Sequence, residues 1–428
     1  MPNLVEQKNL IDFQKGPIRR SLFSNGLVVI HHTAKNFSGA RVNVNFLAGS
    51  IFEKEEHFGV AHLLEHLIFK ESKTEKLKKI EQLGAGINAY TFKENICFEM
   101  AALSSKLPML IPDFLELICQ LDFTDDQFEK EKKVVIQELR EDLDDHETLG
   151  LEMIFEKNFP AGLGHPIAGT IKSVSGLTKK EIASHFKKFF KPSRMIITIV
   201  SSYEDDGLER LIATKVSELL GDKEATPYRL KAQKNSKKLT HFQKTLSKNI
   251  ESSILFYSFD GPSINSENYY DYVILDDLLF EGLSSEYFKK FREENAFVYG
   301  LGSSLNPFAS TGNYIMVFNT QKKHLKPIEH GVRDVIKDIA DNGIDEKRLD
   351  FSKEKLLDGW HLGLDGLDDR VELLQDNEIY QLEDYNFNTF SKKLAQVSGK
   401  TIQKLCKKLY TDPYTLLKLQ PRGSSARK

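Results

Sequence analysis

The sequence predicts a protein of mixed α and β class that is built from two related halves. Runs of β-branched and aromatic residues, typical of strands, alternate with longer amphipathic patterns, typical of helices. A polar segment that lacks a sustained apolar period separates the halves, and a motif of the first half returns in the second. We therefore expect an N-terminal domain over residues 1–225, a linker over 226–248 and a homologous C-terminal domain over 249–428.

Six short segments have the composition of strands. Each is rich in apolar, mostly β-branched or aromatic residues, and the second alternates so that Val42, Val44 and Phe46 share one face. The segments are GLVVIHH from Gly26, RVNVNF from Arg41, NICFEMAAL from Asn95, MIITIV from Met195, GNYIMVF from Gly312 and LLKL from Leu416. Because longer helical patterns lie between them, the class is mixed.

An internal repeat supports the division into two halves. When the chain is shifted by 211 residues, HLLEHLIF at residues 62–69 falls on VILDDLLF at residues 273–280, and the apolar positions agree in type. The polar positions differ, because His62, Glu65 and His66 correspond to Val273, Asp276 and Asp277. We infer a duplicated domain in which the first copy alone keeps the histidines.

The overall charge gives no sign of a nucleic-acid or anionic-membrane partner, because 59 basic side chains balance 62 acidic ones. The lysines of the linker fit a solvated connector, with a basic patch as the alternative. No apolar segment approaches the roughly 20 residues that cross a bilayer, and the N-terminus lacks the apolar core of a signal peptide. Three widely spaced cysteines indicate reduced thiols. We expect a soluble, cytoplasmic protein.

The segment FGVAHLLEHLIFK, Phe58 to Lys70, predicts an amphipathic helix with a distinctive polar side. Its apolar residues share one arc, and His62, Glu65 and His66 share the opposite arc. Because the histidines are four residues apart, their imidazoles lie on one face and can reach one ion. Two such nitrogens, at about 2.0–2.1 Å from a zinc ion, fix half of a tetrahedral site. The alternative is the solvent-facing side of an ordinary surface helix.

Glu65 projects beside the two histidines and is not needed as a ligand. Zinc lowers the pKa of a bound water to about 7, so Glu65 is placed to accept a proton from that water. Open zinc sites in hydrolases typically use three protein ligands. The zinc hypothesis therefore requires a third ligand from elsewhere in the chain.

The segment FTDDQFEKEKKVVIQELREDLDD supplies a candidate. Thr124 and Gln127 form a capping box, so a helix should begin there. Glu131 and Glu138 are seven residues apart, beside the apolar stripe of this helix, and a carboxylate near a buried face needs a partner. Glu138 as a metal ligand and Glu131 as a carboxylate that holds a histidine would satisfy both. The alternative is a charged helix whose glutamates face solvent.

Together these residues resemble the inverted-zincin peptidases of the pitrilysin family, which includes insulin-degrading enzyme and the mitochondrial processing peptidases. The resemblance rests on His62-x-x-Glu65-His66 followed by Glu138, itself seven residues after Glu131. It extends over most of the chain through LAGSIFEKEEHFGVAHLLEHLIFK, GAGINAYTFKENICFEM, GHPIAGTIKSVSGLTKKEI and GLSSEYFKKFREENAFVYGLGS.

The resemblance implies an α+β fold of two homologous repeats, each an antiparallel sheet flanked by helices, which form half of a clamshell. It implies one Zn²⁺ per chain, held by His62, His66 and Glu138. It also implies a peptide bound along a sheet edge, a mode that reads backbone more than side chains. The substrate-binding edge would be Asn88, Ala89, Tyr90 and Thr91.

The last quoted segment resembles the part of the family that carries an arginine and a tyrosine seven residues apart, here Arg292 and Tyr299. The resemblance implies that both donate hydrogen bonds to the scissile carbonyl as it becomes an oxyanion. Without the resemblance, Arg292 would be interpreted as an arginine on a helix surface and Tyr299 as a tyrosine of the core. Because the chain keeps the zinc motif and this pair, we expect a homodimer in which Arg292 and Tyr299 complete the site in trans.

These expectations together predict a zinc-dependent endopeptidase that hydrolyses short or unfolded peptides, such as presequences, inside a dimeric chamber. One alternative is a catalytically silent binding or assembly subunit of the same fold. Another is a catalytic subunit that needs a different partner chain. The complete set of site residues favours the peptidase, and metal content and native mass separate the three hypotheses.

Overall fold

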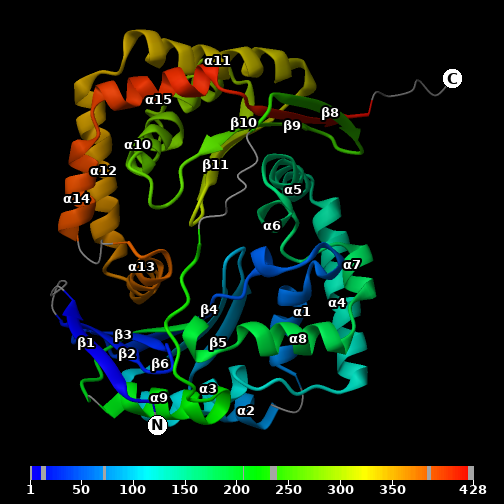
Figure 1. Ribbon diagram of the computed structural model, residues 1–428. Helices are drawn as coiled ribbons and strands as arrows, with labels where there is room; N and C mark the ends of the chain where they lie inside the picture. The colour runs from blue at the N-terminus through cyan, green and yellow to red at the C-terminus, as the bar shows by residue number, and fades with distance from the viewer. Residues whose placement is uncertain are drawn as a thin grey trace. The chain divides into compact units, whose positions relative to one another are not determined.

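The computed structural model describes residues 2–10, 16–70, 74–205, 207–231, 239–382 and 387–422. The chain divides into two compact units (Figure 1). Unit 1 comprises Met1–Glu141, Ala161–Leu230 and Leu362–Phe387, and unit 2 comprises Asp142–Pro160, Lys231–His361 and Asn388–Lys428. These units differ from a single division near residue 225, because residues 142–160 and 362–387 each pack with the other half of the chain. The ranges of the duplicated domains themselves stay a prediction.

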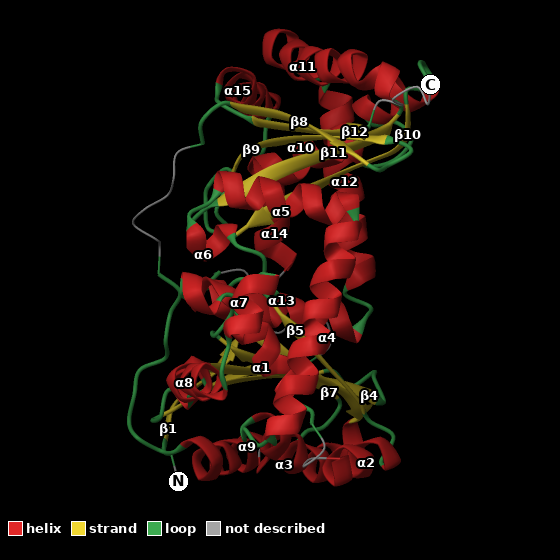
Figure 2. Cartoon of the chain, turned by 90° about the vertical axis from the view of Figure 1, so that its right-hand side faces the viewer, coloured by secondary structure: helices red, strands yellow, loops and turns green. Residues whose placement is uncertain are grey.

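Unit 1 contains one sheet and the helices that cover it. Its strands are β1 (Leu4–Leu10), β2 (Ile18–Phe23), β3 (Val28–Thr33), β4 (Gly39–Phe46), β5 (Gly86–Thr91), β6 (Ile96–Leu103) and β7 (Met195–Ser201). Its helices are α1 (Val60–Ile68), α2 (Thr74–Gln82), α3 (Leu107–Ile118), α4 (Asp125–Asp144), α6 (Ala161–Gly164), α7 (Ile171–Gly176), α8 (Lys179–Phe189), α9 (Gly207–Leu220) and α13 (Leu367–Tyr380). Figure 2 shows α3 and α9 side by side beneath this sheet.

Unit 2 repeats this arrangement with fewer strands. Its strands are β8 (Phe242–Lys248), β9 (Ser253–Gly261), β10 (Val298–Pro307), β11 (Gly312–Thr320) and β12 (Thr415–Pro421). Its helices are α5 (His146–Asn158), α10 (Tyr269–Phe280), the π-helix Phe288–Glu293, α11 (Leu325–Asn342), α12 (Glu346–Gly363), α14 (Phe387–Gln396) and α15 (Gly399–Thr411). All six predicted strand segments are confirmed, as β3, β4, β6, β7, β11 and β12.

The two sheets have the same topology. Within the described residues, sheet 1 runs β1-β2-β3-β7-β4-β6-β5 and sheet 2 runs β10-β11-β9-β12-β8. Read from opposite ends, β3-β7-β4-β6-β5 matches β8-β12-β9-β11-β10 strand for strand, including the direction of every pairing. The predicted α+β fold of two related repeats is therefore confirmed.

Each sheet departs in one place from the predicted antiparallel pairing. The pairs β3–β7 and β8–β12 are parallel. In each repeat the last strand returns beside the first after a long helical connection, and such a crossover is what a parallel pair requires. Each repeat is therefore a mainly antiparallel sheet with one parallel pair.

Strand β4 is buried on both faces. Its side chains Val42 and Val44 point into the core of unit 1, as the alternation predicts. The polar side chains between them are covered by α13, since Gln375 Oε1 accepts hydrogen bonds from Asn43 Nδ2 (2.9 Å) and Asn45 Nδ2 (3.0 Å). Figure 1 shows this helix, in orange, beside the blue strands. A helix far along the sequence thus completes the first sheet.

The predicted linker over 226–248 ends in regular structure. Its last seven residues form β8, which pairs in parallel with β12 at the edge of sheet 2. The linker prediction was therefore wrong at this end, because an edge strand with mostly exposed side chains needs few apolar residues. Part of the remainder, residues 232–238, lies outside the described residues. Within the described parts of the chain, no helix has the length and apolar character needed to span a bilayer.

Candidate metal centre and active site

Helix α1 presents three polar side chains on an otherwise buried helix. Its apolar residues pack in the core of unit 1: Val60, Ala61, Leu63, Leu64, Leu67 and Ile68. His62, Glu65 and His66 lie on the other side and are half-buried. The ring centroids of the two histidines are 4.7 Å apart. The predicted helix and its division into an apolar and a polar side are confirmed.

Helix α4 follows the predicted capping box. Thr124 N donates to Gln127 Oε1 (2.7 Å), and Gln127 N donates to Thr124 Oγ1 (3.2 Å). The apolar side of the helix packs in the core of unit 1 through Phe128, Val135 and Leu139. Beside this stripe, the side chain of Glu131 is 11% exposed and that of Glu138 is 40% exposed. Helix α4 thus brings one buried and one accessible carboxylate to α1.

His62, His66 and Glu138 meet where α1 faces α4. One candidate ligand atom from each lies within 4.8 Å of the other two, and no other such trio occurs among the described residues. His66 Nε2 is 3.6 Å from Glu138 Oε2. Two imidazoles and a carboxylate form a donor set that hydrolytic zinc sites use, with one position left for water. The structure therefore brings together all three predicted ligands.

The environment of His62 also fits a metal ion. Burial, with a smaller effect of the neighbouring His66, lowers the pKa of His62 to about 4. Metal coordination requires the neutral imidazole, and this side chain is therefore already neutral at pH 7. His62 Nδ1 is buried and has no hydrogen-bond partner among the described residues. A polar cluster with these properties is costly as a purely structural feature, because an unpaired buried group loses its hydration.

Glu131 lies behind His66 rather than in the ligand cluster. Its Oε2 is 3.3 Å from His66 Nδ1, and its Oε1 accepts a hydrogen bond from Lys70 Nζ at 2.8 Å. When Nδ1 donates to this carboxylate, Nε2 is left facing Glu138. A carboxylate on the far nitrogen fixes the tautomer and the orientation of a metal-binding imidazole. This is the geometry expected for Glu131.

Glu65 is held by the end of strand β5. Its Oε2 accepts a hydrogen bond from Thr91 Oγ1 at 2.7 Å. Burial raises the pKa of Glu65, and the hydrogen bond from Thr91 and the nearby His66 oppose that effect. A carboxylate whose pKa is raised toward neutrality is better suited to exchange protons with water than an exposed one.

Strand β5 contains the predicted substrate-binding residues. It ends the order of sheet 1, and its outer edge has no partner strand in the part of the chain that the structure describes. Asn88 and Tyr90 are exposed, whereas Ala89 and Thr91 are half-buried on the side of α1. The backbone of this edge has the unpaired groups that a peptide strand needs for β-augmentation.

Arg292 and Tyr299 belong to unit 2 and are close to each other there. Arg292 Nη1 donates to Val298 O at 2.8 Å, and Tyr299 OH donates to Thr320 O at 3.2 Å. Tyr299 is 52% exposed, so the interpretation of a core tyrosine was wrong. The reason is that Tyr299 lies on β10, the edge strand of sheet 2, where most side chains are only half-buried. Both side chains are available to a ligand of unit 2.

Two of these contacts were missed from the sequence. Thr91 holds Glu65 although the two are 26 residues apart, and no local pattern signals such a contact. Lys70 pairs with Glu131. It is four residues after His66 on the same side of the helix, so helical spacing alone contained that signal.

Comparison with known proteins agrees with this arrangement. Residues 27–171 match the family model described as insulinase, peptidase family M16, and residues 176–356 match the model described as the peptidase M16 inactive domain. The first match contains α1 and α4. The second contains α10, which has no histidine at the corresponding positions, and strands β8 to β11 of the second repeat.

Curated relatives and solved structures match nearly the whole chain. The uncharacterized zinc protease YmxG of Bacillus subtilis is 23% identical, over 95% of this chain and 99% of its own length. An uncharacterized zinc protease of Mycobacterium tuberculosis is 26% identical over 95% of this chain and 94% of its own length. Among solved structures, a peptidase M16 inactive domain from Pseudomonas fluorescens has a TM-score of 0.85 at 18% identity, covering 95% of this chain and 98% of its own. A protease from Helicobacter pylori has a TM-score of 0.84 at 18% identity, covering 98% and 100%. The chain therefore belongs to the M16 family of zinc peptidases, the pitrilysin-like family.

Proposed function

We propose that this chain is a zinc-dependent endopeptidase that hydrolyses short or unfolded peptides. One observation carries the proposal: the ligand atoms of His62, His66 and Glu138 converge within 4.8 Å beside Glu65. A binding or assembly subunit has no need of such a cluster. The names of its relatives as zinc proteases support the same conclusion.

In this proposal His62, His66 and Glu138 hold one zinc ion per chain. Zinc at these ligands supplies Lewis acidity, which lowers the pKa of water and polarises a peptide carbonyl. Glu131 keeps His66 in the tautomer whose Nε2 faces Glu138. Lys70, on the other oxygen of Glu131, holds that carboxylate in place.

Glu65 acts as the proton carrier. It accepts a proton from the attacking water and later donates it to the leaving amine. Thr91 orients the carboxylate by donating to Oε2. The raised pKa of Glu65, caused by burial, helps it to accept the proton near neutral pH.

The substrate is proposed to bind as an added strand on β5. Asn88, Ala89, Tyr90 and Thr91 would pair with the peptide through their backbones, so recognition depends little on sequence. Thr91 belongs both to this strand and to the hydrogen bond with Glu65. A peptide in register with β5 is therefore guided toward the catalytic carboxylate. Folded proteins are excluded, because they offer no free extended segment.

Arg292 and Tyr299 are proposed to stabilise the oxyanion in the site of a second copy of the chain. Their support is the resemblance of their segment to the family and their exposure on unit 2. Chains that carry Glu65→Gln and chains that carry Tyr299→Phe would each be inactive alone. When they are mixed and subunits exchange, activity should recover, because the hybrid dimer contains one complete site. If mass spectrometry shows exchanged dimers without activity, the trans arrangement is wrong.

The experiment that tests the peptidase proposal uses a mixed pool of unstructured peptides. Zinc-loaded wild-type protein and the Glu65→Gln variant are incubated with the pool, and cut sites are identified by mass spectrometry. Cleavage by the wild type alone is expected. Absence of cleavage by a folded, zinc-loaded protein would favour a silent binding subunit or a catalytic subunit with a different partner. Native mass spectrometry of the complex from cells would separate those two.

A further inference from the structure

The carboxylate of Glu53 serves as a cap for helix α1 from outside the helix. Gly59, the residue before the helix, has a positive φ of 91° and no side chain to cap the first turn. In its place Glu53 Oε2 accepts from Gly59 N (2.9 Å) and Oε1 accepts from Ala61 N (2.8 Å). Free N–H groups at a helix start favour an anionic acceptor. Ala61 directly precedes His62, so this cap fixes the turn from which His62 projects.

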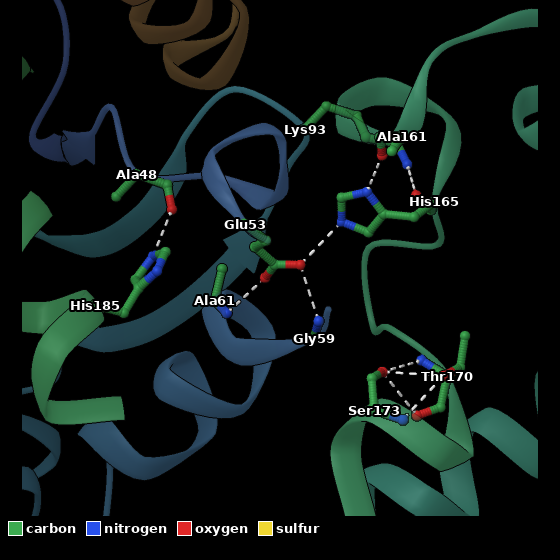
Figure 3. Close-up of polar contacts among 10 residues, drawn as sticks. All are labelled: Ala48, Glu53, Gly59, Ala61, Lys93, Ala161, His165, Thr170, Ser173 and His185. Atoms are coloured by element: carbon green, nitrogen blue, oxygen red, sulfur yellow. Dashed lines mark hydrogen bonds and ion pairs between the residues drawn. The ribbon is translucent and has the colours of Figure 1, made fainter. Parts of the chain in front are cut away.

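Glu53 is itself held by His165. His165 Nε2 lies 2.9 Å from Glu53 Oε2, and Nδ1 faces the carbonyl oxygen of Ala161 (Figure 3). The side chains of Glu53 and His165 are 0% and 4% exposed. A buried carboxylate needs this many donors to remain in place. The ring of Phe58 also stacks on His165, with centroids 3.6 Å apart and an angle of 4°.

Two glycines permit the close approach of the segments that carry these residues. A Cβ on Gly59 would lie 2.4 Å from Ala168 O, and one on Gly169 would lie 2.3 Å from Phe58 O. Both glycines also have positive φ. The GHPIAG segment, residues 164–169, is thus fitted directly against the start of α1.

The same histidine is tied to the substrate-binding edge. Lys93 Nζ donates to His165 O, and Lys93 follows β5 by two residues (Figure 3). A continuous chain of hydrogen bonds therefore runs from the end of β5, through His165 and Glu53, to the first turn of α1. This chain joins the strand proposed to bind the peptide to the helix proposed to bind the metal.

We propose that Glu53 and His165 are positioning residues, which fix the first turn of α1 and so the placement of His62 at the metal. The proposal rests on the proposed zinc function and adds two residues to the machinery that supports it. A pair that merely stabilised the fold would leave zinc affinity and ligand geometry unchanged when weakened. Weakening a positioning pair would change both the zinc affinity and the ligand geometry, because a displaced His62 no longer converges with His66 and Glu138.

The test measures zinc affinity by chelator competition and the visible spectrum of the cobalt-loaded protein, which reports ligand geometry. Glu53→Gln keeps the size of the side chain but loses one acceptor, and His165→Leu removes both ring nitrogens. Each is expected to weaken zinc binding roughly 10-fold and to alter the cobalt spectrum. His165→Gln, which restores an N–H near Glu53, should recover most of the affinity.

His185→Leu is the matched control. His185 is also buried in unit 1, with Nε2 bonded to Ala48 O at 3.1 Å, and among the described residues it has no hydrogen bond to Glu53 or to the first turn of α1 (Figure 3). His185→Leu should lower the free energy of unfolding measured in urea without changing zinc affinity. If Glu53→Gln keeps the zinc affinity and the cobalt spectrum of the wild type, the positioning role is wrong, whereas the proposed function is unaffected. Glu53→Gln decides the test by itself if His165→Leu does not fold. Failure of the wild type to bind zinc would overturn the proposed function as well.

Discussion

Helices α1 and α10 occupy the same place in two sheets of the same topology, but their polar residues have opposite surroundings. In α10, Asp276 accepts a hydrogen bond from Tyr314 OH at 2.7 Å. Asp277 accepts one from Ser352 Oγ at 2.6 Å and lies 2.6 Å from Lys355 Nζ. Both of these acidic groups of α10 thus have donors within unit 2.

The histidines on the polar side of α1 have different surroundings. His62 Nδ1 has no hydrogen-bond partner among the described residues, and His66 Nε2 faces a carboxylate rather than a donor. Helix α4 brings acceptors to α1, whereas α12 brings a hydroxyl and an ammonium to α10. The comparison teaches that the two repeats differ in the partners of this helix as well as in its histidines.

The largest expected effect comes from replacing His66 of α1 by aspartate, the residue at the corresponding position of α10. His66→Asp should abolish peptide hydrolysis and weaken zinc binding by more than the roughly 100-fold that loss of a ligand's hydrogen-bond partner causes. Zinc titration with a chelator and a peptide-cleavage assay measure both. The matched control is Asp277→His in α10, which should gain no zinc, because Val273 supplies no second ligand. Zinc bound by that control would contradict the comparison.

The next effect isolates the base from the metal. Glu65→Gln should lower kcat by about 10²–10⁴-fold, because proton transfer is lost while His62, His66 and Glu138 are intact. Zinc content per chain should stay at the wild-type level. Asp276→Asn, at the corresponding position of α10, should leave kcat unchanged, since an amide oxygen still accepts from Tyr314. Equal losses in the two variants would show that the effect is structural.

A smaller effect is expected on stability in unit 2. Asp277→Ala should lower the free energy of unfolding by about 2 kcal/mol, because Ser352 and the partly exposed Lys355 lose a buried acceptor. Urea unfolding measures the change, and zinc affinity should not move. The control Ser352→Ala removes one hydrogen bond and should cost about 1 kcal/mol. A large loss of zinc affinity in Asp277→Ala would mean that the two repeats are coupled.

An effect of similar size, confined to acidic pH, is expected in the metal-free protein. Burial lowers the pKa of His62 from an ordinary value near 6.5 to about 4. Below pH 6.5 the unfolded chain binds a proton that the folded chain refuses, so stability falls as the pH drops toward 4. His62→Val introduces the residue found at the corresponding position of α10 and removes the titrating imidazole. Its free energy of unfolding relative to wild type should therefore rise by about 2 kcal/mol between pH 7 and pH 4. Val273→Ala should show a pH-independent difference, and a flat His62→Val difference would refute the prediction.

The site helix and its partner could be predicted because their signals are local. The spacing of His62 and His66, the capping box at Thr124 and the seven-residue interval to Glu138 each depend on helical geometry alone. The six strand segments were equally visible from composition. A shift of 211 residues was enough to predict the duplication that the two sheets confirm.

The contacts that complete the site depend on distant segments, and local patterns do not contain them. Thr91 reaches Glu65, and His165 reaches Glu53 across 112 residues, only after sheet 1 has formed. The same holds for the exchange of α5 and α13 between the units. The exchanged helices also differ, since α13 meets Asn43 and Asn45 through a polar Gln375 whereas α5 packs Ile154 in an apolar cluster. The sequence of neither helix indicates which unit the helix packs with.

The most direct test of the central claim is an anomalous X-ray scattering measurement at the zinc absorption edge, on crystals of the protein purified without added chelator. We predict one zinc peak per chain, in contact with His62, His66 and Glu138 on α1 and α4. No peak is expected beside Asp276 and Asp277 on α10. A zinc-supplemented crystal with no peak at the first cluster, or with its peak at α10 instead, would contradict the account.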